Sequence, residues 1–148
     1  MPTGKGWMKN AVLASMALVL TGCGGGASTT TSNVDYAKVR AMSAFYERFM
    51  NEHRSQPPKD EQEYRDFLAS KASELEGAGL SVDEMFASPR GGPITWVYGR
   101  LPASSHAGMT YIAYETTPVD GKRLAIAMRG MFEEMDETKF KTAFPAAN

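Results

Sequence analysis

After residue 33, hydrophobic residues recur at steps of three and four positions, which is the spacing of one face of an α-helix. The first such stripe consists of Val34, Ala37, Ala41 or Met42, Phe45, Phe49 and His53. Asn33 or Asp35 is suited to cap the start of this helix, because a short polar side chain can accept from the first free backbone N–H groups. Pro57-Pro58 would end the helix. We therefore predict a long helix over about residues 34–53.

A second helix is predicted to begin at Asp60. Glu63 stands three residues later, which matches a capping pattern. The apolar stripe behind it consists of Tyr64, Phe67, Leu68, Ala72 and Leu75. Gly77 and Gly79 are suited to end this helix. Residues 81–84 (SVDE) repeat the capping pattern and predict a short helical turn.

Beyond residue 93 the pattern changes to short runs rich in β-branched and aromatic residues, which favour strands. Runs of this kind occupy residues 94–98, 109–114, 123–128 and 131–134. Asp136 is suited to cap a short last helix that carries Phe140 and Phe144. Short links between consecutive strands predict an antiparallel sheet of three or four strands, with one face covered by the long N-terminal helix. The expected class is α+β, in a single domain over residues 34–148.

A different pattern precedes this domain. Lys5 and Lys9 are followed by ten apolar residues, Ala11 to Leu20, a run too short for a transmembrane helix but suited to a signal peptide. The next residues complete Leu20-Thr21-Gly22-Cys23, which resembles the lipobox of bacterial lipoprotein precursors. The resemblance implies that residues 1–22 are removed and that Cys23, the only cysteine, carries a diacylglycerol group and an acylated amino group. Two or more acyl chains hold a protein stably in a membrane.

Residues 24–33 (GGGASTTTSN) have no bulky apolar side chain and predict a flexible tether with a root-mean-square span of roughly 18 Å. Gly24 stands where an Asp would indicate retention at the inner membrane in lipoproteins of this kind. The resemblance therefore implies an extracytoplasmic protein that faces the periplasm or the cell surface, with the outer membrane favoured.

Charge excludes some partners. The chain from Cys23 onward has 14 basic and 17 acidic residues, a net charge of −3. No basic stripe appears, so neither nucleic acid nor an anionic membrane face is indicated as a partner. An acylated Cys23 leaves no thiol for a disulfide, so packing alone must stabilise the domain.

The order of these segments resembles the soluble part of type II secretion pseudopilins and a group of small bacterial lipoproteins with the same layout. The resemblance is carried by residues 46–52 (YERFMNE), 57–58 (PP), 60–63 (DEQE), 88–98 (SPRGGPITWVY) and 120–123 (DGKR). It implies a helix packed against a small antiparallel sheet. The chain lacks the prepilin leader, and Ser88 replaces the usual Asp, so neither polymerisation nor the metal site of that family is carried over.

Candidate catalytic chemistry is sparse. Ser104-Ser105-His106 suggests a nucleophile beside a base, and the alternative function is a small envelope hydrolase that uses His106 with Ser104 or a distant carboxylate. His53 and His106 are far apart in sequence, so no zinc site is predicted. Met128, Met131 and Met135 have two interpretations. One is a copper site, and the other is a place in the core, where methionine is common. We predict no metal and no cofactor.

We therefore expect a non-catalytic interaction or structural module of the cell envelope, anchored to a membrane through Cys23 and bound to an envelope protein. Trp and Tyr are common contact residues at interfaces. The predicted contact surface comprises the loop 100–108 and an exposed sheet face, with Trp96, Tyr98, Arg100, His106 and Tyr111 as its residues. Core packing is the alternative, and the more common role, for at least half of these aromatic side chains.

Overall fold

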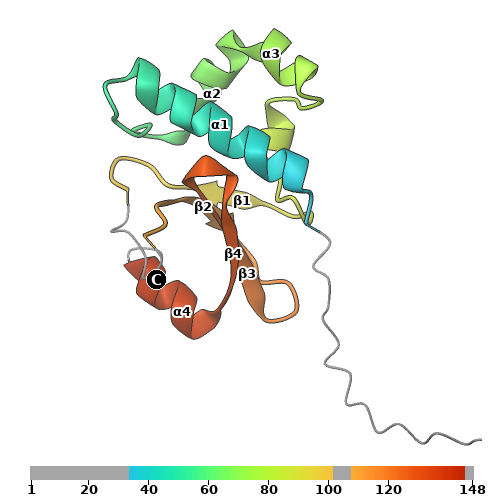
Figure 1. Ribbon diagram of the computed structural model, residues 1–148, viewed down its shortest axis with the longest axis vertical. Coiled ribbons are helices and arrows are strands. Elements are labelled where there is room, and N and C mark those ends of the chain that lie inside the picture. The colour runs from blue at the N-terminus through green and yellow to red at the C-terminus, as the bar shows by residue number, and fades with distance from the viewer. Residues whose placement is uncertain (1–33, 102–107, 146–148) are drawn as a thin grey trace, which may run out of the picture. The chain divides into compact units, whose positions relative to one another are not determined.

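The computed structural model describes residues 34–101 and 108–145 (Figure 1). Its elements are the helices α1 (Tyr36–Glu52), α2 (Glu61–Ser70), α3 (Ala72–Gly77) and α4 (Glu137–Ala143), the strands β1 (Ile94–Trp96), β2 (Tyr111–Glu115), β3 (Lys122–Ala127) and β4 (Phe132–Asp136), and the 3-10 turns η1 (Asp83–Phe86) and η2 (Met128–Gly130). The predicted signal peptide, tether and Cys23 lie outside the described residues, as do Ser104 and His106. No helix of the described part is long and apolar enough to cross a membrane.

The four strands form one antiparallel sheet in the order β1-β2-β3-β4. Ile94 pairs with Glu115, Tyr114 with Ala125, and the register shifts between Tyr111 and Ala113. The β3–β4 connection is tight, because Arg129 and Gly130 both adopt positive φ angles, 63° and 67°. The mixture of helices and sheet, the antiparallel sheet, here with four strands, and the short C-terminal helix are confirmed, and this arrangement is compatible with the α+β class.

Helix α1 begins at its N-cap Asp35, whose Oδ1 accepts from the Lys38 N–H at 3.0 Å. The buried side of the helix consists mainly of its larger side chains, Val39, Met42, Phe45, Tyr46, Phe49 and Met50, together with Ser43. Ala37 is exposed and Ala41 half-buried. The helix is thus rotated relative to the stripe expected from the sequence, because burying valine, methionine and aromatic side chains removes more apolar area from water than burying alanine.

The predicted second helix is divided into α2 and α3 at Lys71, whose φ is −111° and ψ is 18°. Asp60 caps α2 as expected, with the Glu63 N–H donating to its Oδ1 at 2.9 Å. The break follows Ser70, whose hydroxyl donates to the Phe67 carbonyl at 2.6 Å. Such a side chain competes with the helical hydrogen bonds of the backbone.

Two hydrophobic clusters cover opposite faces of the sheet. The larger joins side chains of α1, α2 and α3 to Ile94, Trp96, Ile112, Leu124 and Ile126. The smaller joins α4 residues Phe140 and Phe144 to Tyr111, Ala125 and Ala127. Alternate residues of β3 thus point into different clusters, as a strand requires. Figure 1 shows α1 to α3 on one side of the strands and α4 on the other.

The segment 88–93 is fixed to the sheet by a buried ion pair. The Arg90 guanidinium binds both carboxylate oxygens of Glu115, and its Nη1 lies 3.0 Å from Oε1 of Glu134. Glu115 also accepts from Ser88 Oγ and, at 2.8 Å, from the Leu124 N–H. The side chains of Arg90 and Glu115 are only 9% and 2% exposed.

Candidate functional site

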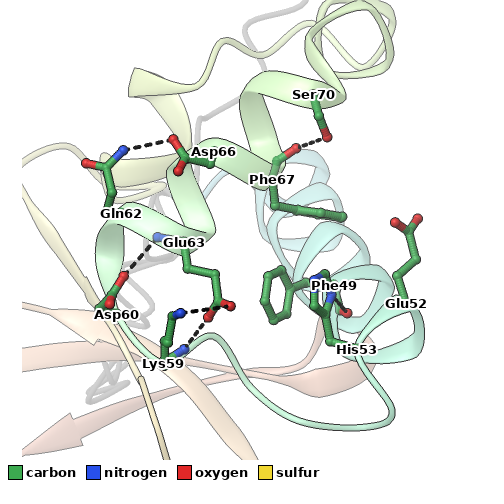
Figure 2. Close-up of a pocket in the computed structure, with 10 residues that line it drawn as sticks. All are labelled: Phe49, Glu52, His53, Lys59, Asp60, Gln62, Glu63, Asp66, Phe67 and Ser70. Atoms are coloured by element: carbon green, nitrogen blue, oxygen red, sulfur yellow. Dashed lines mark hydrogen bonds and ion pairs between the residues drawn. The ribbon is translucent and has the colours of Figure 1, made fainter.

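A groove of about 530 Å³ lies between the C-terminal end of α1 and the first turns of α2 (Figure 2). It is lined by Phe49, Glu52, His53, Lys59, Asp60, Gln62, Glu63, Asp66, Phe67 and Ser70. An overlapping hollow of about 490 Å³ extends it along the 54–57 loop to Gly99. We call the two together the α1–α2 groove.

Three rings form the floor of this groove. The His53 imidazole stacks on Phe49 with the ring centroids 3.9 Å apart and an interplanar angle of 4°. Phe67 meets both rings edge-on, at 5.1 Å from Phe49 and 6.2 Å from His53. Phe49 and Phe67 are buried, whereas His53 is exposed. His53 is therefore the ring that the groove presents to solvent, whereas the Phe49 and Phe67 rings pack behind it.

His53 is the C-cap of α1. Its Nδ1 lies 2.8 Å from the Phe49 carbonyl oxygen. Because a carbonyl oxygen can only accept, Nδ1 must carry a hydrogen. In the neutral ring Nε2 is then an acceptor. His53 thus ends α1 and faces solvent, although the sequence pattern placed it in the apolar stripe of that helix.

Carboxylates dominate the rim. Four of them, those of Glu52, Asp60, Glu63 and Asp66, line the groove, whereas the basic residues of its lining are Lys59 and Arg54. Hydrogen bonds from Arg48 and Lys71 lower the pKa of Glu52. Asp66 accepts from Gln62 at 2.8 Å, a contact drawn in Figure 2. Glu52 and Glu63 are paired with basic side chains, which leaves Asp60 and Asp66 as the carboxylates of the rim without an ion pair in the described part of the chain.

The wall beyond α1 is built from backbone in an unusual conformation. Arg54 and Ser55 have φ angles of 56° and 63°, a left-handed region that costs a non-glycine residue roughly 1–2 kcal/mol. The Ser55 N–H donates to the Met50 carbonyl at 2.7 Å, which closes the end of the helix. The chain thus turns sharply into the Gln56–Pro58 segment that borders the groove.

Two residues of the contact surface expected from the sequence, Tyr98 and Arg100, do not line the groove. Gly99 between them does, and its N–H donates to the Pro58 carbonyl at 2.7 Å. Tyr98 is half-buried and Arg100 is exposed. Burial, followed by the charge of Glu61, raises the pKa of Tyr98 above its ordinary value, so this hydroxyl stays protonated near neutral pH.

The other part of that expectation is wrong. Trp96 is 2% exposed and Tyr111 is 1% exposed. The Trp96 Nε1–H donates to the Met85 carbonyl at 3.0 Å, and the Tyr111 hydroxyl donates to Glu133 at 2.6 Å. The physical reason is that α4 covers the sheet face expected to be open, while the α1–α3 side covers the other. His106 lies outside the described residues.

Sequence reasoning placed Phe49 and Phe67 in the core and did not connect Lys59, Glu63 or Asp66 to a site. The available signal was the spacing of Asp60, Glu63 and Asp66, which puts three carboxylates within two turns at the start of one helix. Within residues 34–101 and 108–145, no group of three or more His, Cys, Asp or Glu side chains is placed to hold a metal ion.

Comparison with known protein families, with curated proteins and with solved structures finds no match to this chain. A role for the groove therefore has to be inferred from its own residues. Its open shape, aromatic floor and acidic rim suit the binding of a protein segment.

Proposed function

We propose that this chain is a lipid-anchored, non-catalytic interaction module of the cell envelope, and that the α1–α2 groove binds its protein partner. One observation carries the proposal. The groove lies at the C-terminal end of α1, whereas the segment from Cys23 joins the domain at the N-terminal end. Helix α1 has 17 residues, a length of about 25 Å at 1.5 Å per residue. The groove is thus held away from the point of attachment and open to a partner.

The chemistry of the groove selects the class of partner. The carboxylates of Asp60 and Asp66 on its rim favour a segment with a lysine or arginine side chain, and the exposed His53 ring can pack against the aliphatic part of that side chain or against a neighbouring apolar residue. We therefore propose a basic segment of an envelope protein as the occupant.

The groove can be tested with a photoreactive amino acid placed at Gln56, an exposed residue of its lining. We expect a defined protein adduct in cells from this position, and none from the same probe at Thr138, which is exposed on α4 on the far side of the sheet. Asp66→Lys in the Gln56 probe variant should lower the adduct yield roughly tenfold, a change that corresponds to about 1.4 kcal/mol.

Asp66 is suited to this reversal of charge because it is exposed. Its side chain accepts a hydrogen bond from Gln62, which Figure 2 draws. An unchanged thermal midpoint of the Asp66→Lys variant would show that the fold is intact. Equal adducts from positions 56 and 138, or a yield that Asp66→Lys leaves unchanged, would contradict the groove as the binding site.

The anchor is tested separately with Cys23→Ser. In cells fed an alkyne analogue of palmitate, we expect the natural chain to be labelled, to be cleaved before Cys23 and to enter the detergent phase on phase separation. The Cys23→Ser chain should lose essentially all of the label, because serine offers no thiol for alkylation. Label that persists in the serine variant would refute lipidation at this residue.

A further inference from the structure

A second surface lies along one side of α1, from its first residue Tyr36 to the level of Glu47. Tyr36 and Met131 are 61% and 40% exposed, and they are two of the three large hydrophobic side chains classed as exposed in the described part of the chain. Met131 directly precedes Phe132, whose half-buried ring meets Tyr36 edge-on at a centroid distance of 5.2 Å. Helix α1 and the start of β4 thus form one small apolar surface.

Two arginines adjoin this surface. Arg40 follows Tyr36 by one turn of α1, so the two residues share a face of the helix. Arg129 lies two residues before Met131, and both arginines are exposed. Neither guanidinium has an ion pair among residues 34–101 and 108–145, in contrast to Arg48, Arg65, Arg90 and Arg123. We call Tyr36, Arg40, Arg129, Met131 and Phe132 the tether-end patch.

The patch is held rigidly by contacts between α1 and the β3–β4 connection. Ser43 Oγ accepts from the Gly130 N–H at 2.9 Å, and Glu47 accepts from the Arg129 N–H. Gly130 packs so closely on α1 that a Cβ added to it would lie 2.9 Å from the Cγ of Arg40. The Glu47 carboxylate is bound to Arg129 through its backbone N–H, which leaves the guanidinium free to reach outward.

We infer that the tether-end patch rests on the surface of the membrane in which Cys23 is anchored. The inference rests on the proposed lipidation. A tether of the composition of residues 24–33 is expected to have a root-mean-square span of roughly 18 Å, so the proposed anchor would join the domain beside Tyr36, the first residue of α1. Tyrosine side chains are enriched at bilayer–water interfaces, and arginines are attracted to anionic lipid headgroups. The patch has both residue types and includes Tyr36, the residue of α1 nearest to that junction.

A small patch is sufficient for this role. A short flexible tether gives the domain a millimolar effective concentration at the surface, so weak contacts produce docking without strong binding of the free domain. Docking through the tether-end patch brings the side of α1 that carries Tyr36 and Arg40 to the lipid surface.

The inference is tested with the chain from Cys23 onward, which contains every described element and whose single thiol couples to a maleimide lipid in vesicles of phosphatidylcholine and phosphatidylglycerol. This coupling imposes the tether whether or not cells lipidate Cys23. Tyr36→Trp places a reporter in the patch, and Val119→Trp places one at the third exposed hydrophobic residue, outside the patch. Buried Trp96 contributes the same background to both variants.

We expect acyl chains brominated near the headgroup to quench the emission of Tyr36→Trp and to leave that of Val119→Trp nearly unchanged. Adding Arg40→Glu and Arg129→Glu to Tyr36→Trp should lower the docked fraction by roughly an order of magnitude on anionic vesicles, because each arginine contributes to headgroup attraction. The same double substitution should have little effect on vesicles of phosphatidylcholine alone.

Equal quenching at positions 36 and 119 would overturn the inference. So would quenching at position 36 that is unchanged by the two arginine-to-glutamate substitutions. Palmitate labelling of Cys23 in cells reports on the anchor independently. If the chain is labelled but position 36 is not quenched, the membrane contact is rejected and the lipid anchor is retained. The patch would then be assigned to a protein contact.

Discussion

Replacing Trp96 with alanine should lower the free energy of unfolding by about 3–5 kcal/mol, the range for removal of a large buried aromatic side chain. The Trp96 ring stacks on Tyr46 with centroids 5.5 Å apart and meets Tyr64 at 4.9 Å. Its loss would leave a cavity between α1, α2 and β1, and would also leave the Met85 carbonyl without the indole donor. Urea unfolding followed by far-UV circular dichroism measures the effect without relying on tryptophan emission.

Trp96→Phe is the matched control. Phenylalanine retains part of the ring contact with Tyr46 but has no N–H for Met85, so its cost should lie clearly below that of alanine. Both variants should still bind the partner at temperatures where they remain folded. If Trp96→Ala abolished partner binding with a cost below about 1 kcal/mol, Trp96 would be a contact residue and not part of the core.

Removing one member of the Arg90–Glu115 pair should be similarly severe. Glu115→Ala is expected to cost about 3–5 kcal/mol, since it leaves the Arg90 guanidinium buried without its main carboxylate partner. It also removes the acceptor for Ser88 and for the Leu124 N–H, so the 88–93 segment loses its attachment to the sheet. Chemical unfolding of the variant measures the loss.

A paired replacement separates the charge from the packing. Arg90→Met with Glu115→Leu removes both charges and fills similar volume, so it should recover a large part of the stability lost in Glu115→Ala. A double variant no more stable than Glu115→Ala would mean that the hydrogen bonds of Glu115 to Ser88 and Leu124 carry the effect.

The same pair produces a pH dependence. Burial opposes ionisation of Glu115, but hydrogen bonds from Arg90, Ser88 and the Leu124 N–H outweigh it and lower the pKa of Glu115 below its ordinary value of 4.5. A carboxyl whose pKa is lowered on folding stabilises the fold above its unfolded pKa, and this contribution is lost as the pH falls through the folded pKa. Stability should therefore decline below about pH 4.5, with a shallower slope in Glu115→Gln.

Local features of the sequence determine much of this fold. The caps at Asp60 and Asp136 and the Ser81-to-Glu84 box depend on neighbouring residues alone, and all three are present. The strands also follow from short β-favouring runs, although β1 ends at Trp96 and not at Tyr98. Past that point the chain leaves the sheet, because the Gly99 N–H binds Pro58.

Features that depend on distant residues were not predictable in the same way. Arg90 and Glu115 are 25 positions apart, and nothing local in either segment indicates their pairing. Burial of Tyr111 depends on where α4 folds back, and the ring centroids of Tyr111 and Phe144 lie 5.5 Å apart. The groove likewise exists only once α1, α2 and Gly99 are brought together. An amphipathic pattern tells which residues avoid water but not which element covers them.

The two edges of the sheet also affect how neighbouring copies meet. At one edge, β1 has only three residues and is preceded by Pro93, which has no N–H to offer a new strand. At the other edge, β4 carries the acidic residues Glu133, Glu134 and Asp136. Short, proline-flanked or charged edges are poor templates for strand addition. If the chain is anchored as proposed, molecules crowded into the two dimensions of a membrane surface would therefore be protected against joining edge to edge into β-aggregates.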